Sequence, residues 1–156
     1  MVDIYTNPDL YDSIHHNYEW DKTLIQAIAK DINGPVLELA SGTGRLTQAI
    51  LELGLQYKGL ELSQSFLDRA KMKFGGKADF ILGDMRDFDL EMEFDLIFIG
   101  FNSFLHNLTT EDAKKCLACI KKHLTKNGKF LVSIFVPDPI FLYREEGKLF
   151  PATDFF

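Results

Sequence analysis

Glu38-Leu39-Ala40-Ser41-Gly42-Thr43-Gly44-Arg45 is the stretch of sequence that decides the fold. It continues an apolar run that begins at Val36, and two glycines then interrupt the apolar residues. Because glycine allows a tight turn and a close approach of the backbone to a ligand, we expect a strand over residues 36–40 and a turn after it. Apolar residues at helical spacing follow the turn, at Leu46, Ala49, Ile50 and Leu53. The stretch therefore predicts a strand, a glycine turn and a helix, in that order.

Strands and helices alternate on both sides of this stretch. A helix with an apolar face of Trp20, Leu24, Ala27 and Ile28 precedes it and should end at Asn33-Gly34-Pro35. Further helices are predicted after the N-cap residues Ser63 and Thr109, ending at Gly75-Gly76 and near Leu124. The remaining strands are predicted over residues 57–61, 78–82, 94–100 and 129–136.

The strands predict a parallel sheet. The run over residues 129–136 is nearly continuous in Phe, Leu, Val and Ile, without the alternation of a strand that has one wet face. Such strands are typical of a doubly wound α/β fold, a mostly parallel Rossmann-like sheet with helices on both faces. No linker or repeat divides residues 1–156, so we expect one domain.

Composition limits the partners that we expect. The chain has 17 basic and 23 acidic residues and a net charge of -6, which is the wrong sign for binding nucleic acid or anionic lipid. The longest apolar runs, residues 96–101 and 130–136, are far shorter than the roughly 20 residues that cross a bilayer. The first residues do not resemble a secretory signal. We therefore expect a cytoplasmic protein with a small-molecule partner.

The two cysteines, Cys116 and Cys119, form a C-x-x-C pair. They fall within a helical pattern, with no second pair and no cluster of histidines nearby. Buried small residues on a helix face are a better interpretation than a redox or metal site. We expect no bound metal.

Polar residues at the ends of the strands predict the position of a site, because ligands of a doubly wound sheet bind outside the carboxyl ends of its strands. Glu61 ends the second strand, where an acidic side chain can accept both hydroxyls of a ribose. Glu38 lies inside the first strand and needs partners, since an unpaired buried carboxylate is costly. The third and fourth strands end in Gly83-Asp84-Met85 and in Gly100-Phe101-Asn102.

These motifs together resemble those of class I S-adenosylmethionine-dependent methyltransferases. The resemblance covers residues 11–137 and includes the first-strand motif, Glu61-Leu62-Ser63, residues 83–88, 94–98 and 101–104. It implies that the cofactor is S-adenosylmethionine and that the chain transfers its methyl group to an acceptor that the sequence does not identify.

The resemblance also implies roles for individual residues. Gly42 and Gly44 would pass under the amino acid portion of the cofactor, and Glu61 would hold the ribose. Leu62 and Met85 would enclose adenine, and Asp84 would accept from its amino group. The remaining residues that we expect at the cofactor are Tyr18, Glu38, Ala40, Arg45 and Gly100.

The acceptor is expected beside the end of the fourth strand. Phe101, Asn102 and His106 are the candidates for binding it, and His106 and Asn102 are also the candidates for catalysis. For His106, a loop histidine without chemistry is an equally good interpretation. Residues 1–33 are expected to form a lid and a helix, with Trp20 either anchoring the helix or covering the cofactor. Arg45 would orient the cofactor carboxylate or be solvated.

Two departures from the family pattern matter. Ala40 stands where the family often has glycine. The family sheet also normally continues with a sixth and an antiparallel seventh strand, for which few residues remain after Val136. We therefore expect a fragment that lacks the last two strands, with an apolar strand edge that residues 138–156 cover or that pairs with a second chain.

Two other functions stay open. A nicotinamide-dependent oxidoreductase shares the glycine turn and the ribose acid, but Thr47 stands where its third glycine would be. A module that binds the cofactor without catalysing a reaction is the other alternative.

Overall fold

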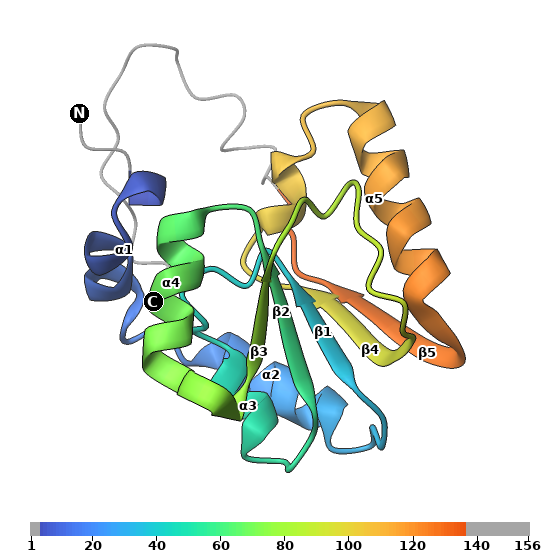
Figure 1. Ribbon diagram of the computed structural model, residues 1–156, viewed down its shortest axis with the longest axis horizontal. Helices are drawn as coiled ribbons and strands as arrows, with labels where there is room; N and C mark the ends of the chain where they lie inside the picture. Colours follow the sequence, from blue (N-terminus) through green and yellow to red (C-terminus); the bar gives the residue numbers. More distant parts are fainter. Residues whose placement is uncertain (1–3, 137–156) are drawn as a thin grey trace.

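The computed structural model describes residues 4–136 (Figure 1). The prediction for residues 138–156 therefore lies outside the described part of the chain. The helices are α1 (Pro8–His15), α2 (Trp20–Ala29), α3 (Thr47–Leu51), α4 (Gln64–Phe74) and α5 (Thr110–His123). The strands are β1 (Val36–Leu39), β2 (Tyr57–Glu61), β3 (Asp79–Leu82), β4 (Phe94–Ile99) and β5 (Leu124–Val132). Short 3-10 turns occupy Ile4–Thr6, Gly75–Lys77 and Ser103–His106.

The strands form one sheet in the order β3-β2-β1-β4-β5, and all the pairs are parallel. The chain moves outward from β1 to β3, then returns to place β4 on the other side of β1. The connections that leave the carboxyl ends of β1 and β4 therefore run to opposite sides of the sheet. Sheets of this kind bind ligands at this point, where the strand order reverses. The predicted doubly wound α/β fold is confirmed.

Helices cover both faces of the sheet, and two separate cores result (Figure 1). On one face, α2, α3 and α4 pack on side chains such as Val36, Tyr57 and Phe98. On the other face, α5 packs on Leu37, Leu39 and Ile97. Every residue of β1 is buried, which explains why its sequence does not alternate between apolar and polar residues.

The buried face of α2 is not the face that we expected. Trp20 is 55% exposed and Leu24 is 46% exposed, so Trp20 does not anchor the helix in the core. Asp21, Ile25 and Ala29 are buried instead. The prediction failed because the buried face begins with a charged residue, Asp21. Its partner, Arg45, is 24 residues away in the chain.

The expected boundaries of β5 were also wrong. Residues 129–132 pair with β4 as expected, but the strand begins at Leu124, which pairs with Phe94. The ladder shifts register between Phe94 and Leu96, so Asn127-Gly128 lies in an irregular part of the strand rather than in a connection before it. Gly128 is needed there, because a Cβ would lie 2.9 Å from the carbonyl oxygen of Phe94. Beyond Val132, the backbone of Ser133 bonds to Ile99 and to the turn at residue 102.

The helix signals were mostly correct. Thr109 caps α5, with the amide of Asp112 donating to its hydroxyl at 3.0 Å. Ser63 precedes α4 without a capping bond from its side chain. Cys116 is buried on α5 and Cys119 is half-buried, and both are free thiols, as expected for packing residues.

Candidate functional site

The loop after β1 contains three residues with positive φ angles: Ala40 at 56°, Gly42 at 59° and Gly44 at 79°. This left-handed backbone turns the chain sharply from β1 toward α3 and leaves the loop close to α4. A Cβ on Gly44 would lie 2.7 Å from the ring of Phe74, so glycine is required at that position for packing. Around Gly42 the nearest atom to such a Cβ is 4.0 Å away, on Phe66, which lines a cavity.

We expect the Ala40→Gly variant to be more stable than the natural chain by roughly 0.5–1 kcal/mol. Alanine at a positive φ is strained, and the relief of this strain exceeds the entropy that glycine adds to the unfolded state. The measurement is the free energy of unfolding in urea. Ala113→Gly in α5 is the control, and it should lose about 1 kcal/mol. A loss in both variants would mean that the loop carries no strain at Ala40.

Glu61 ends β2, and its carboxylate holds two backbone segments together. Oε2 accepts from the amide of Gly42 and Oε1 accepts from the amide of Ser63, both at 2.8 Å. The side chain lines the cavity and is 9% exposed. Each oxygen keeps one further lone pair, so a pair of neighbouring hydroxyl groups has two acceptors available.

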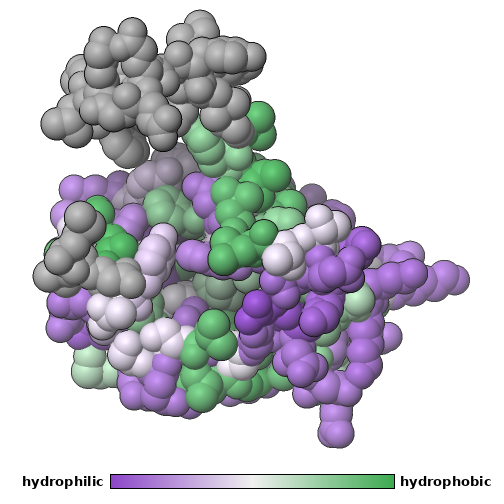
Figure 2. Space-filling model, turned by 90° about the horizontal axis from the view of Figure 1, so that it is seen from above, coloured by the Kyte–Doolittle hydropathy of each residue, from purple (hydrophilic) through white to green (hydrophobic). Residues whose placement is uncertain are grey.

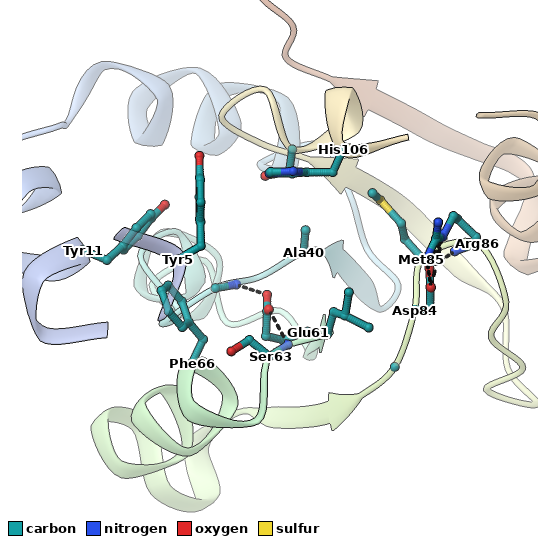
Figure 3. Close-up of a pocket in the computed structure, with 14 residues that line it drawn as sticks. Tyr5, Tyr11, Ala40, Glu61, Ser63, Phe66, Asp84, Met85, Arg86 and His106 are labelled. Atoms are coloured by element: carbon teal, nitrogen blue, oxygen red, sulfur yellow. Dashed lines mark hydrogen bonds and ion pairs between the residues drawn. The ribbon is translucent and has the colours of Figure 1, made fainter. Parts of the chain in front are cut away.

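A cavity of about 420 Å³ opens at these strand ends, a size typical of small-molecule sites. Figure 3 shows aromatic side chains on one side of it and Asp84, Met85 and Arg86 on the opposite side, with Ala40 and Glu61 between them. Its lining residues are Tyr5, Tyr11, Ala40, Gly42, Glu61, Leu62, Ser63, Phe66, Gly83, Asp84, Met85, Arg86, Ser103 and His106.

Part of the predicted site lies in this lining. The predicted cofactor residues that line the cavity are Ala40, Gly42, Glu61, Leu62, Asp84 and Met85. His106 lines it as well. The predicted residues outside the lining are Tyr18, Glu38, Gly44, Arg45, Gly100, Phe101 and Asn102.

Arg45 is neither solvated nor pointed into the cavity. Its guanidinium forms two bonds with the buried carboxylate of Asp21, at 2.8 and 2.5 Å, and a third to the carbonyl of Tyr18 at 3.1 Å. It also lies over the rings of Tyr18 and Phe101, at 5.4 and 5.1 Å from their centroids. Arg45 therefore ties the glycine loop to the start of α2, and this pairing explains the buried Asp21.

Glu38 is buried beneath the loop, and its partner is the phenol of Tyr57, which donates to Oε2 at 2.5 Å. Burial raises the pKa of Glu38 to about 8, against the opposing effect of the Tyr57 hydrogen bond. The expectation that this carboxylate has a partner is confirmed. Its place is under the cavity wall rather than in it.

The loop after β4 separates the three residues predicted for the acceptor. Phe101 and Asn102 both have left-handed backbone, with φ of 52° and 65°. This turn directs the Phe101 ring onto Arg45, and Asn102 is exposed outside the lining. His106 is exposed at the cavity and stands perpendicular to the ring of Tyr5, with centroids 5.4 Å apart (Figure 3).

Sequence reasoning missed several lining residues. Tyr5 and Phe66 arrive from the N-terminal turn and from α4, so no strand-end motif contains them. Arg86 and Ser103 did lie within the quoted motifs, but nothing in the spacing indicated a contact with the cavity. Packing between distant segments decides these positions.

Two negative observations apply to residues 4–136. No three histidine, cysteine, aspartate or glutamate side chains in that range are grouped as a metal ion requires. None of the helices there is long and apolar enough to cross a membrane.

Comparison with known proteins identifies the family. A family model described as a methyltransferase domain matches residues 36–128. An uncharacterized methyltransferase of Geobacillus sp. (strain WCH70) is 30% identical over 121 residues, which are 78% of this chain and 55% of the relative. The chain thus spans about half the length of this relative.

Solved structures agree with the family model. The glycopeptide N-methyltransferase MtfA, complexed with S-adenosyl-L-methionine, has a TM-score of 0.66 and 32% identity, covering 72% of this chain and 52% of MtfA. DesVI of Streptomyces venezuelae has a TM-score of 0.72 and 26% identity, covering 86% of this chain and 58% of DesVI. The chain belongs to the methyltransferase domain family, among the class I S-adenosylmethionine-dependent methyltransferases.

Proposed function

We propose that this chain binds S-adenosylmethionine in the cavity at the strand ends and is the cofactor-binding part of an enzyme that methylates a small molecule. The observation that carries the proposal is Glu61. Its two carboxylate oxygens are fixed by loop amides and line a cavity large enough for the cofactor. A ribose diol needs this arrangement of two adjacent acceptors.

The lining residues fit the parts of the cofactor. Ala40, Gly42 and the turn at Gly44 would lie under its amino acid portion, and Glu61 would accept from the ribose. Leu62, which is 66% exposed, and the half-buried Met85 would enclose adenine. Asn107 supports this arrangement, because its amide lies 3.9 Å from the Met85 sulfur. Asp84 would accept from the adenine amino group.

The other predicted cofactor residues would act by positioning the loop. Arg45 and Tyr18 join the loop to α2. Gly100 leaves space for Leu46, because a Cβ at position 100 would lie 2.8 Å from Cδ1 of Leu46. Glu38 supports the loop from beneath, through Tyr57 on β2.

Helix α1 is suited to be the predicted lid. Tyr11 lines the cavity and packs against Phe66, with ring centroids 5.3 Å apart. Asp12, one residue later, accepts from the Thr43 hydroxyl in the glycine loop at 2.6 Å. It also accepts from Arg69 at 3.1 Å and Lys73 at 2.7 Å on α4. Asp12 therefore fastens the helix over the loop.

A small-molecule acceptor fits the surroundings of the cavity mouth. Tyr5 and Leu62, which line the cavity, are 54% and 66% exposed, and Figure 2 shows hydrophobic patches among polar surface on the face seen from above. An apolar mouth with a net charge of -6 does not suit nucleic acid. Because the bound cofactor would supply an electrophilic methyl group, the protein mainly has to align the acceptor and exclude water.

His106 and Ser103 are the polar side chains at this mouth that we propose for acceptor contact, with His106 as the candidate base. Asn102 and Phe101 lie just before them on the same loop. They would affect the acceptor by shaping this loop.

Calorimetric titration of the chain with S-adenosylhomocysteine and with NAD tests the proposal. We expect binding of the first and none of the second. If NAD bound instead, an oxidoreductase would be favoured. Binding of S-adenosylhomocysteine without methyl transfer by the full-length protein would favour the inactive module.

We further infer that two chains pair along β5. Within residues 4–136, β5 pairs only with β4, and none of its residues is buried. Trp20, Leu24, Leu131 and Ile134 line an apolar groove beside it. A strand edge that no described strand covers, with an apolar groove beside it, favours association with another strand.

Light scattering should therefore detect a dimer that Ile134→Lys weakens, since a charge at an edge opposes pairing. Met72→Lys is the matched control, because Met72 is an exposed apolar residue on α4. A natural chain that is monomeric at every concentration would refute the dimer.

A cytoplasmic location stays a prediction, supported by the two free thiols.

A further inference from the structure

Asp84 lines the cavity, but a single residue occupies its carboxylate. Oδ1 accepts from the backbone amide of Arg86 and from Nε, both at 2.9 Å. Oδ2 accepts from Nε at 3.0 Å and from Nη2 at 2.5 Å. The single Nε hydrogen is shared between the two oxygens, so three N–H groups of Arg86 occupy most of the roughly four lone-pair sites of the Asp84 carboxylate. An adenine amino group therefore competes with Arg86 for the carboxylate of Asp84.

The backbone of Arg86 is fixed by hydrogen bonds, whereas its side chain has a second carboxylate, Asp112, within reach. Its carbonyl accepts from the Cys119 thiol at 3.4 Å. Its side chain is 37% exposed, and Nη1 lies 3.6 Å from a carboxylate oxygen of Asp112. Asp112 is itself held by the Thr109 hydroxyl at 2.9 Å, in the first turn of α5. The guanidinium thus lies between two carboxylates, bonded to Asp84 and near Asp112.

We propose that Arg86 determines the base selectivity of the cofactor site by competing for Asp84 and moving to Asp112 when an adenine amino group takes its place. The inference rests on the proposed binding of S-adenosylmethionine. Oδ1 keeps its bond from the backbone amide of Arg86 during the exchange, so Asp84 stays oriented. The guanidinium stays beside the position proposed for adenine. There it can donate hydrogen bonds to a different base that carries an acceptor in place of the amino group.

The exchange has a small energetic cost because both carboxylates are partly exposed. The side chains of Asp84 and Asp112 are 28% and 24% exposed, and solvent-accessible ion pairs contribute little. Arg86 keeps the pKa of Asp84 below its usual value through these hydrogen bonds. An unperturbed aspartate is also ionised at neutral pH, so Asp84 can still accept when the guanidinium leaves.

Calorimetry with two ligands tests the proposal: S-adenosylhomocysteine and S-inosylhomocysteine, which has an oxygen in place of the amino group. In Arg86→Gln, S-adenosylhomocysteine should bind roughly two- to fivefold more tightly, because its competitor for Asp84 is gone. S-inosylhomocysteine should bind more weakly, because it loses the guanidinium donors. The ratio of the two affinities should rise roughly tenfold.

Asp112→Asn should have the opposite effect on S-adenosylhomocysteine, with binding roughly two- to fivefold weaker, because the displaced guanidinium loses its second carboxylate. Lys122→Gln is the control. Lys122 pairs with Asp89 at the surface, outside the cavity lining, and neither affinity should change.

An unchanged affinity ratio in Arg86→Gln would overturn the proposal, whether both ligands bind as before or both bind more weakly. If that variant does not fold, Arg86→Lys provides the test, since it keeps the charge without the two-point contact and should raise the ratio by less. A folded natural chain that binds neither ligand would instead refute the proposed function. The two failures are therefore distinguishable.

Discussion

Replacing Glu61 with alanine should weaken S-adenosylhomocysteine binding by roughly 10- to 100-fold, the scale of hydrogen bonds to a charged group. The ribose would lose both acceptors. The amides of Gly42 and Ser63 would lose theirs as well, so the loop would no longer be held in place before the ligand arrives. Calorimetry measures the affinity, and urea unfolding shows how much of the effect comes from the loop.

A ligand without one hydroxyl separates these two causes. The natural chain should bind 2′-deoxy-S-adenosylhomocysteine more weakly than the ribose form, whereas Glu61→Ala should bind the two alike. The coupling between ligand and residue then measures the ribose contact alone. Glu111→Ala, which removes an exposed carboxylate on α5, is the matched control. If Glu61→Ala kept the full affinity, or still discriminated between the two ligands, Glu61 would not hold the ribose.

The sequence was informative about the fold because its signals are local. The apolar run of β1, the glycines after it and the Thr109 cap each act within a few residues, and each lies where it was expected. The Asn127-Gly128 turn was misplaced because its effect depends on contact with Phe94 in the neighbouring strand. A local turn signal does not distinguish an irregularity within a strand from a connection before it.

The site was predictable where a strand end places a residue and unpredictable where another segment does. Glu61 ends β2 and Met85 follows closely after β3, and both line the cavity as these positions predict. Arg45 follows the glycine turn in the same way, but Asp21, far away in the chain, takes its guanidinium. Tyr5 reaches the cavity only because the N-terminal turn folds against His106. Charge pairing and packing over long sequence distances are not encoded in any short motif.

Glu38 carries the largest expected effect on stability. Its pKa is about 8 in the folded chain, compared with 4.5 for an unperturbed glutamate, chiefly because burial disfavours the charged form. The folded state therefore holds a proton that the unfolded state releases as the pH rises above about 4.5. The contribution of Glu38 to stability is present below this value and is lost as the pH rises to about 8.

We therefore expect Glu38→Gln to be as stable as the natural chain near pH 4.5 and more stable by a few kcal/mol near pH 9, as linkage predicts for a shift of this size. The glutamine oxygen still accepts from Tyr57, and no charge has to be buried. Urea unfolding between pH 4.5 and 9 measures the difference. The other groups that act on Glu38, including Arg45, Asp21 and Glu61, are present in both chains, so subtraction removes their own titration.

Tyr57→Phe completes the test. Its phenol stabilises the carboxylate, so removing it should raise the pKa of Glu38 further and extend the loss of stability to higher pH. A stability difference between the natural chain and Glu38→Gln that does not change with pH would mean that Glu38 is charged in the folded protein at neutral pH. Tyr57 would then donate to a charged carboxylate of Glu38, and burial would not raise the pKa of Glu38.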